Sequence, residues 1–151
     1  RVLFRSVDIS TGDAITPKEI EYHFKLLFED RQIGVLAYNI ETVLSEKFEG
    51  IISKGIANTR ARDYYDIYIL MKFQKQNIDM KILKKDIINT FNKRETTYYL
   101  ENITKRISEI ENSDDLKEIW NNYKNKFSYA NNISFQDTID VIKEISNILE
   151  N

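Results

Sequence analysis

The stretch Ile20-Glu21-Tyr22-His23-Phe24-Lys25-Leu26-Leu27-Phe28 alternates apolar side chains with others over nine residues, which predicts a half-buried β-strand. From Asn39 the period changes. In Asn39-Ile40-Glu41-Thr42-Val43-Leu44-Ser45-Glu46-Lys47-Phe48 the apolar side chains recur every three or four residues, which predicts an amphipathic helix. This change of period predicts an α+β chain with its β part first.

Two neighbouring segments extend the β part. Residues 2–9 are apolar and β-branched and end at a Ser-Thr-Gly-Asp turn, which indicates a strand with Asp8 near its end. Residues 33–38 follow a polar turn at 29–32 and are the expected hairpin partner of residues 20–28. We therefore expect a sheet of two to three strands within residues 1–38.

The rest of the chain, residues 39–151, is expected to form a mostly helical domain. Helices are predicted near residues 40–54, 60–76, 79–93, 100–110, 114–127 and 134–149. Their ends are marked by Gly55 after the first helix, by Asn58 or Thr59 before the second and by Asp79 before the third. No proline follows Pro17, which suits a long helical region.

Composition excludes several classes of site. The 151 residues, 42% of them apolar, are enough for one domain or two very small ones. Cysteine is absent and His23 is the only histidine, which excludes disulfide scaffolds, cysteine nucleophiles and histidine-built zinc sites. No apolar run approaches the ~20 residues of a membrane span, so we expect a cytoplasmic protein that does not use a membrane. Because the first residue is Arg1, we also expect a fragment of a longer protein.

Charge is distributed unevenly along the chain. Residues 1–46 carry a net charge of −3, residues 47–106 carry +6, and residues 107–151 carry −5. A basic middle segment points to a polyanionic partner. The alternative is a solvated surface that is rich in lysine.

The segment Asn58-Thr59-Arg60-Ala61-Arg62-Asp63-Tyr64-Tyr65-Asp66 gathers charged residues on one predicted helix. Asp63 and Asp66 lie one turn apart, and the arginines stand at spacings that allow ion pairs within the helix. Such pairs are one interpretation. The other is that the carboxylates hold a lysine, a metal or a hydroxyl while the guanidiniums bind phosphate.

Lys47 is the second candidate, because it lies beside the apolar stripe of the first predicted helix. A lysine there either extends over the core edge or meets a partly buried acid, and Asp63 or Asp66 on the following helix is the obvious partner. The third candidate is Asp8, since carboxylates at strand ends hold magnesium in many phosphoryl-transfer enzymes. A second carboxylate to complete that site is not evident.

Four segments in order, residues 7–13, 37–47, 58–66 and 90–96, resemble the later motifs of the AbiEii/AbiGii toxin nucleotidyltransferases. These are bacterial abortive-infection and toxin–antitoxin proteins. The resemblance implies a DNA polymerase β-like nucleotidyltransferase sheet, of which residues 1–38 are the C-terminal part, followed by a helical domain. It implies a toxin that uses Mg²⁺ and a nucleoside triphosphate (NTP) to attach a nucleotide to an acceptor such as tRNA. Such a toxin inhibits growth or phage propagation, and its cognate antitoxin forms no tight complex with it.

The resemblance also implies roles for individual residues. Lys47 matches the lysine that holds nucleotide phosphates, and Asp63 and Asp66 match the two acids of the Arg-x-Lys/Arg-Asp-x-x-Asp motif. Arg60 and Arg62 match its basic residues and are expected to contact nucleotide. Asp8 matches an acid on the strand after the metal-binding motif and is the expected metal ligand.

The match has one large departure: the family's first motif, a Gly-Ser turn followed by Asp-x-Asp, is not in these residues and would lie upstream of Arg1. Two-metal phosphoryl transfer depends on those groups, so we expect the full-length protein to be the enzyme and this fragment to be inactive alone. A smaller departure is Arg62, where lysine is usual. The competing hypothesis is a non-catalytic helical module that binds a partner protein or RNA, with Lys47 bridging two helices.

Overall fold

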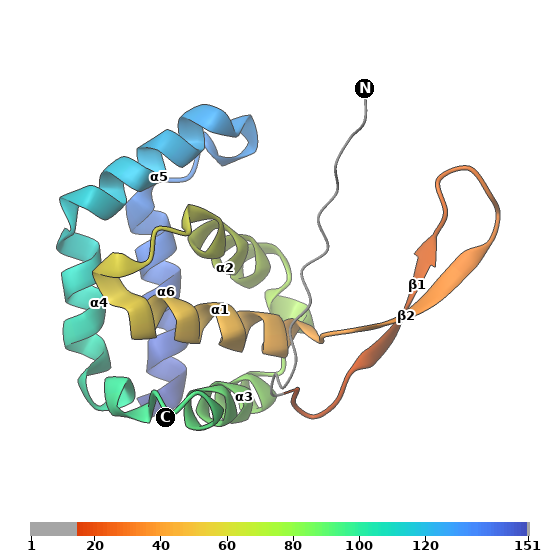
Figure 1. Ribbon diagram of the computed structural model, residues 1–151, viewed down its shortest axis with the longest axis horizontal. Coiled ribbons are helices and arrows are strands. Elements are labelled where there is room, and N and C mark those ends of the chain that lie inside the picture. The colour runs from red at the N-terminus through yellow and green to blue at the C-terminus, as the bar shows by residue number, and fades with distance from the viewer. Residues whose placement is uncertain (1–14, 151) are drawn as a thin grey trace.

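A hairpin projects from a set of packed helices in the computed structural model, which describes residues 15–150 (Figure 1). Strands β1 (Ile20–Lys25) and β2 (Gln32–Ala37) pair antiparallel, with Ile20 opposite Ala37 and Lys25 opposite Gln32. The predicted pairing of these two segments is therefore confirmed. The strand predicted at residues 2–9, and Asp8 with it, lies outside the described residues.

The predicted half-burial of the first strand is wrong, as is its length. β1 ends at Lys25, and Leu26 begins the connection by donating its N–H to the carbonyl of Arg31 at 3.2 Å. Every residue of β1 is exposed, and Tyr22 and Phe24 on its apolar face keep 54% and 51% of their surface in solvent. Alternation shows which side chains share a face, but no described helix covers that face.

The six predicted helices are all present. They are α1 (Ile40–Lys54), α2 (Ala61–Phe73), α3 (Met80–Lys93), α4 (Ile103–Asn112), α5 (Asp114–Lys126) and α6 (Phe135–Glu150). Short 3₁₀ turns connect several of them: η1 (Gly55–Ala57), η2 (Lys75–Asn77), η3 (Thr97–Asn102) and η4 (Ser128–Ala130). Each helix boundary lies within three residues of its prediction.

Local side-chain chemistry sets the helix ends. The Asn39 side chain accepts the N–H of Thr42 at 2.7 Å and begins α1, and Asp79 accepts two N–H groups at the start of α3. Gly55 ends α1 at φ +56°, a conformation that favours glycine. The predicted boundaries at Gly55 and Asp79 are confirmed.

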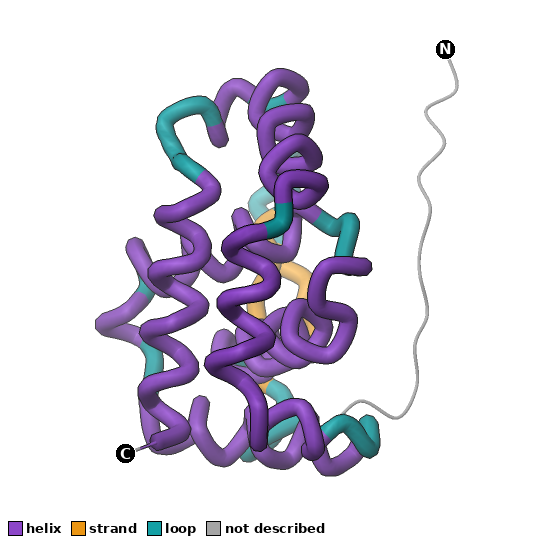
Figure 2. Tube along the Cα trace, turned by 90° about the vertical axis from the view of Figure 1, so that its left-hand side faces the viewer, coloured by secondary structure: helices purple, strands orange, loops and turns teal. Residues whose placement is uncertain are grey.

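The core lies between the helices. α1 packs along α3 and against α2, while α6 packs against α2 and α4, and the strands lie behind the helices in Figure 2. The largest fully buried side chains come from α1, α2, α3 and α5: Phe48, Tyr64, Phe91 and Trp120. None of the helices within residues 15–150 combines the length and apolar content needed to cross a membrane.

Candidate functional site

Lys47 of α1 reaches both acids of α2. Its Nζ atom lies 3.0 Å from Asp63 Oδ1 and 2.8 Å from Asp66 Oδ2. The two helices are joined by the short η1 connection and run in opposite directions in Figure 1, which brings the middle of α1 beside the first turns of α2. The predicted approach of Lys47 to these acids is confirmed.

The ammonium is partly buried and stays charged. Lys47 keeps 23% of its side-chain surface exposed, and Asp63 and Asp66 keep 18% and 26%. Burial lowers the pKa of Lys47, but the hydrogen bonds to Asp66 and Asp63 and the charges of both acids outweigh burial, so the pKa is raised. An ammonium has three N–H donors. Two carboxylates take two of them, which leaves one for a ligand.

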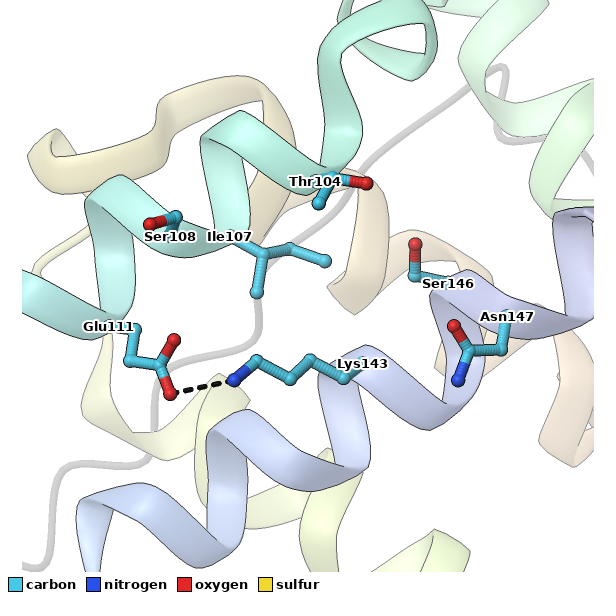
Figure 3. Close-up of a pocket in the computed structure, with 7 residues that line it drawn as sticks. All are labelled: Thr104, Ile107, Ser108, Glu111, Lys143, Ser146 and Asn147. Carbon is cyan, nitrogen blue, oxygen red and sulfur yellow. Dashed lines mark hydrogen bonds and ion pairs between the residues drawn. The ribbon is translucent and has the colours of Figure 1, made fainter.

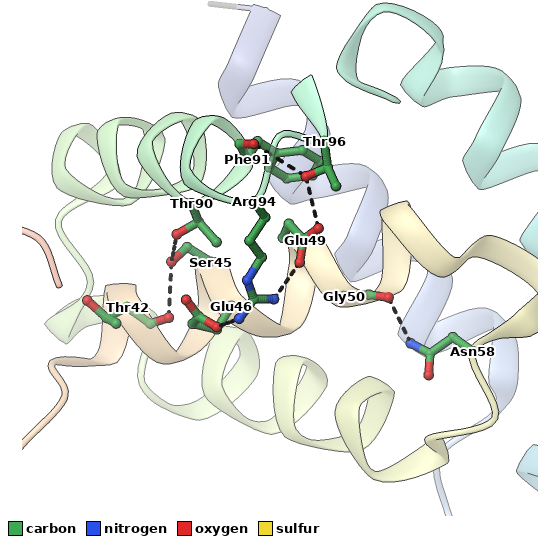
Figure 4. Close-up of polar contacts among 10 residues, drawn as sticks. All are labelled: Thr42, Ser45, Glu46, Glu49, Gly50, Asn58, Thr90, Phe91, Arg94 and Thr96. Carbon is green, nitrogen blue, oxygen red and sulfur yellow. Dashed lines mark hydrogen bonds and ion pairs between the residues drawn. The ribbon is translucent and has the colours of Figure 1, made fainter. Parts of the chain in front are cut away.

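A polar network fixes α1 against the end of α3 (Figure 4). Arg94 forms ion pairs with Glu46 and Glu49, and Thr96 donates its hydroxyl to Glu49 Oε1 at 3.0 Å. Glu49 is buried, so its carboxylate needs these partners. The network holds the turn of α1 that carries Lys47.

The loop before α2 is fixed by Asn58, which does not cap the helix as predicted. Arg60 precedes the first helical residue and makes no side-chain cap. Asn58 is buried, donates its amide to the carbonyl of Gly50 at 3.3 Å and accepts the N–H of Arg60 at 3.0 Å. Its side chain therefore ties α1 to the loop instead of capping the next helix.

A cavity of about 380 Å³ opens beside Lys47. Four basic and two acidic residues are among those that line it: Tyr38, Val43, Glu46, Lys47, Gly50, Lys54, Arg60, Asp63 and Arg94. Within residues 15–150, Lys54 and Arg60 form no ion pair, whereas Lys47 and Arg94 are paired with carboxylates. Lys54 and Arg60 are therefore the lining cations that no described carboxylate contacts, while Lys47 and Arg94 each have two carboxylate partners.

Arg62 faces a different cavity, which lies between α2 and α5, has a volume of about 590 Å³ and is also lined by Arg60 and Asp63. The Arg62 side chain is 80% exposed, and its Nε atom lies 3.8 Å from Asp66 Oδ2. Of the two predicted intrahelical ion pairs, only this loose one is present among the described residues. The structure thus brings Lys47, Arg60 and Asp63 to one cavity and places Arg62 at the next.

A third cavity, of about 370 Å³, lies between α4 and α6 (Figure 3). Lys143 of α6 reaches across it to Glu111 of α4 at 2.7 Å. None of the residues predicted for the site lines this cavity.

The described residues do not fit a magnesium site. Among residues 15–150, no three Asp, Glu, His or Cys side chains are grouped so that they could hold a metal ion. Asp63 and Asp66 share Lys47 between them, and Asp8 lies outside the described residues. No metal-dependent step is therefore derived from this part of the chain.

Sequence reasoning missed Lys54 and Arg94 as cavity residues. Lys54 is the last residue of the first predicted helix and Arg94 lies in the matched segment 90–96, and neither position by itself indicates a site. The signal for Arg94 was Glu49, which falls between Phe48 and Ile52 on the apolar side of α1 and therefore needs a cation.

The family model for the AbiEii nucleotidyl transferase toxin of type IV toxin–antitoxin systems matches residues 4–141. The chain belongs to the AbiEii toxin family. Family membership implies a nucleotide substrate and a cognate antitoxin. Comparison with curated proteins and comparison with solved structures found no match. In this AbiEii chain, the contacts of Lys47 with Asp63 and Asp66 join two of the segments that resemble the family, residues 37–47 and 58–66.

Proposed function

We propose that this AbiEii chain is the C-terminal part of a toxin that transfers a nucleotide from an NTP to an acceptor such as tRNA. The observation that carries the proposal is the position of Lys47. Two acids of the next helix hold its ammonium at the wall of a cavity that also presents Lys54 and Arg60.

The charges of the cavity suit a triphosphate. Phosphate oxygens bind best to fixed cationic donors, and arginine offers several N–H groups in a planar fork. Lys54 and Arg60, which pair with no described acid, are the cations available to the phosphates. Lys47 supplies an N–H donor with a fixed direction, because the carboxylates of Asp63 and Asp66 restrain its ammonium.

Asp63 and Asp66 have different places in this proposal. Asp63 lines the cavity and lies next to any ligand bound there, whereas Asp66 contacts Lys47 from the other side and positions it. Asp8 remains the proposed metal ligand. Bound magnesium would offset the charge of the phosphates, as it does in phosphoryl-transfer enzymes generally.

A second candidate function is a non-catalytic helical module that binds a partner protein or RNA. It is favoured by the pairing of Lys47 with both acids of α2, since an ion pair between two helices also serves a purely structural purpose. We also propose that the antitoxin restrains the toxin without a tight complex.

Nucleotide transfer by the full-length protein distinguishes the two functions. Labelled NTPs and a tRNA mixture are supplied with Mg²⁺, and the wild type is compared with Lys47→Ala and Asp63→Ala. We expect losses of about a hundredfold or more, because Lys47→Ala removes a cation proposed to hold the triphosphate and Asp63→Ala removes a carboxylate that restrains this cation. Lys117→Ala, an exposed lysine of α5 away from the cavity, is the matched control. Wild-type rates for both site variants would overturn the assignment of Lys47 and Asp63 to the site, whereas no transfer by the wild type would overturn the proposed function in favour of the binding module.

A further inference from the structure

The cavity between α2 and α5 differs from the Lys47 cavity in its aromatic lining. Its walls come from the start of α2 and from one face of α5, and they include Arg60, Arg62, Tyr123, Lys126 and Phe127. We infer that this groove binds a single-stranded nucleic acid, with phosphates on the basic residues and bases against the rings of Tyr123 and Phe127.

The basic residues of the groove are available to a ligand. Among the described residues, Arg60 and Lys126 form no ion pair, and Arg62 makes only the 3.8 Å contact with Asp66. One acidic residue, Asp63, lines the groove, and its carboxylate already accepts a hydrogen bond from Lys47. The groove therefore carries an excess of positive charge, which favours a polyanion.

Aromatic rings pack against one another at the α5 wall of the groove. Phe127 lies 4.9 Å from Tyr123 and 5.4 Å from Tyr129, measured between ring centroids, and the Tyr123 and Tyr129 hydroxyls are 3.0 Å apart. Contacts between the rings hold them in place, so they form a fixed platform. Lys126 Nζ lies 5.5 Å from the Phe127 centroid, which puts a cation beside a stacking surface.

Tyr123 and Phe127 are half-buried and line the groove. Basic residues beside aromatic rings are the usual means of binding single strands, because every base has a face that stacks and every linkage carries a charge. A duplex would not offer its base faces to the rings. An acidic peptide would satisfy the charges but would leave the stacking surface unused. The groove therefore favours single-stranded nucleic acid over either.

The position of the groove suggests what the bound strand is for. Arg60 and Asp63 line both cavities, so a strand in the groove would end beside the Lys47 cavity. Its terminal hydroxyl would then lie near the bound NTP. This role as acceptor rests on the proposed function, whereas binding of the strand does not.

The test is binding of labelled single-stranded oligonucleotides of about eight residues to the full-length protein, followed by fluorescence anisotropy at several salt concentrations. We expect Phe127→Leu to weaken binding at least about fivefold without changing the salt dependence. We expect Lys126→Ala to reduce the slope of log K against log[salt] by about 0.7, the value for one lost phosphate contact. RNA and DNA strands are compared to identify which is bound.

Phe73→Leu and Lys117→Ala are the matched controls, since both side chains reach solvent and neither lines the groove. Binding that Phe127→Leu and Lys126→Ala both leave unchanged would overturn the inference, as would tighter binding of an acidic peptide than of the oligonucleotide. Thermal unfolding of Phe127→Leu checks that this variant is folded. Lys126→Ala is an independent test, because Lys126 is exposed and its removal leaves the core intact. If the wild type binds the strand as expected but transfers no nucleotide, the proposed function fails and the groove inference stands. If the groove variants bind the strand and transfer nucleotide as the wild type does, the groove inference fails and the proposed function stands.

Discussion

Lys47 brings together two acids that would otherwise repel each other. Asp63 and Asp66 lie one turn apart on α2, and like charges at this spacing destabilise a helix. The ammonium of Lys47 lies within 3.0 Å of both and supplies the missing cation. A side chain that a substrate would contact thus also contributes to the stability of the helix pair.

We expect Lys47→Met to lower the free energy of unfolding by about 1–2 kcal/mol near neutral pH, between the values for exposed and buried ion pairs. The folded state raises the pKa of Lys47 above the ordinary 10.5, so the stabilisation is fully present below that value. It is lost as pH rises through the pKa of the folded state. Urea denaturation of both proteins from pH 7 to pH 11 should therefore show a difference that shrinks only at the alkaline end. A difference that shrinks toward acid pH would contradict this account.

At the scale of elements, the contact between α1 and α3 sets the orientation of the site. Arg94, just after α3, pairs with Glu46 and Glu49 of α1, and Ser45 meets Thr90 at 3.3 Å (Figure 4). These polar contacts lie beside the edge-to-face contact of Phe48 with Phe91. Polar and apolar contacts together determine which face of α1 turns toward α2.

We expect Arg94→Met to lower the free energy of unfolding by about 3 kcal/mol, because the buried Glu49 carboxylate loses its cation. The double variant Arg94→Met, Glu49→Leu should recover much of that loss, since the buried charge of Glu49 is then gone. Chemical denaturation of the two variants measures both effects. Equal losses for the single and double variants would show that Glu49 is not the cause.

At the scale of the whole molecule, the helices hold the core and the hairpin stands apart from it. The buried apolar cluster is drawn from residues 44–145, whereas Ile20, Tyr22, Phe24, Ile33 and Val35 of the hairpin remain exposed. The segment before the hairpin does contact the helices, where Asn39, the N-cap of α1, donates to the carbonyl of Thr16 at 2.6 Å. We therefore propose residue 39 as the boundary of a helical domain.

A chain of residues 39–151 should accordingly keep a cooperative thermal transition and its helical circular dichroism. We expect a modest loss of stability from removal of the contacts at Thr16, because that residue is buried against Thr42 and Asn39. Loss of the transition would mean that the segment before residue 39 is part of the helical fold.

Sequence periodicity predicted the helices because each one buries a stripe that local spacing reveals. It predicted the approach of Lys47 to Asp63 because a short connection makes consecutive helices neighbours. It missed Arg94, whose partner Glu49 is 45 residues away, since pairing over that distance depends on how α1 and α3 pack. It also overestimated burial of the hairpin, because alternation does not show what covers a face.

The most direct test of the central claim is the affinity of the full-length protein for an NTP, measured by isothermal titration calorimetry in the wild type, Lys47→Met and Lys117→Met. If Lys47 contacts the triphosphate, its removal should raise the Kd about tenfold or more, the cost of losing one charge-assisted hydrogen bond, while Lys117→Met binds like the wild type. A folded Lys47→Met protein that binds the NTP as tightly as the wild type would show that the lysine only joins two helices.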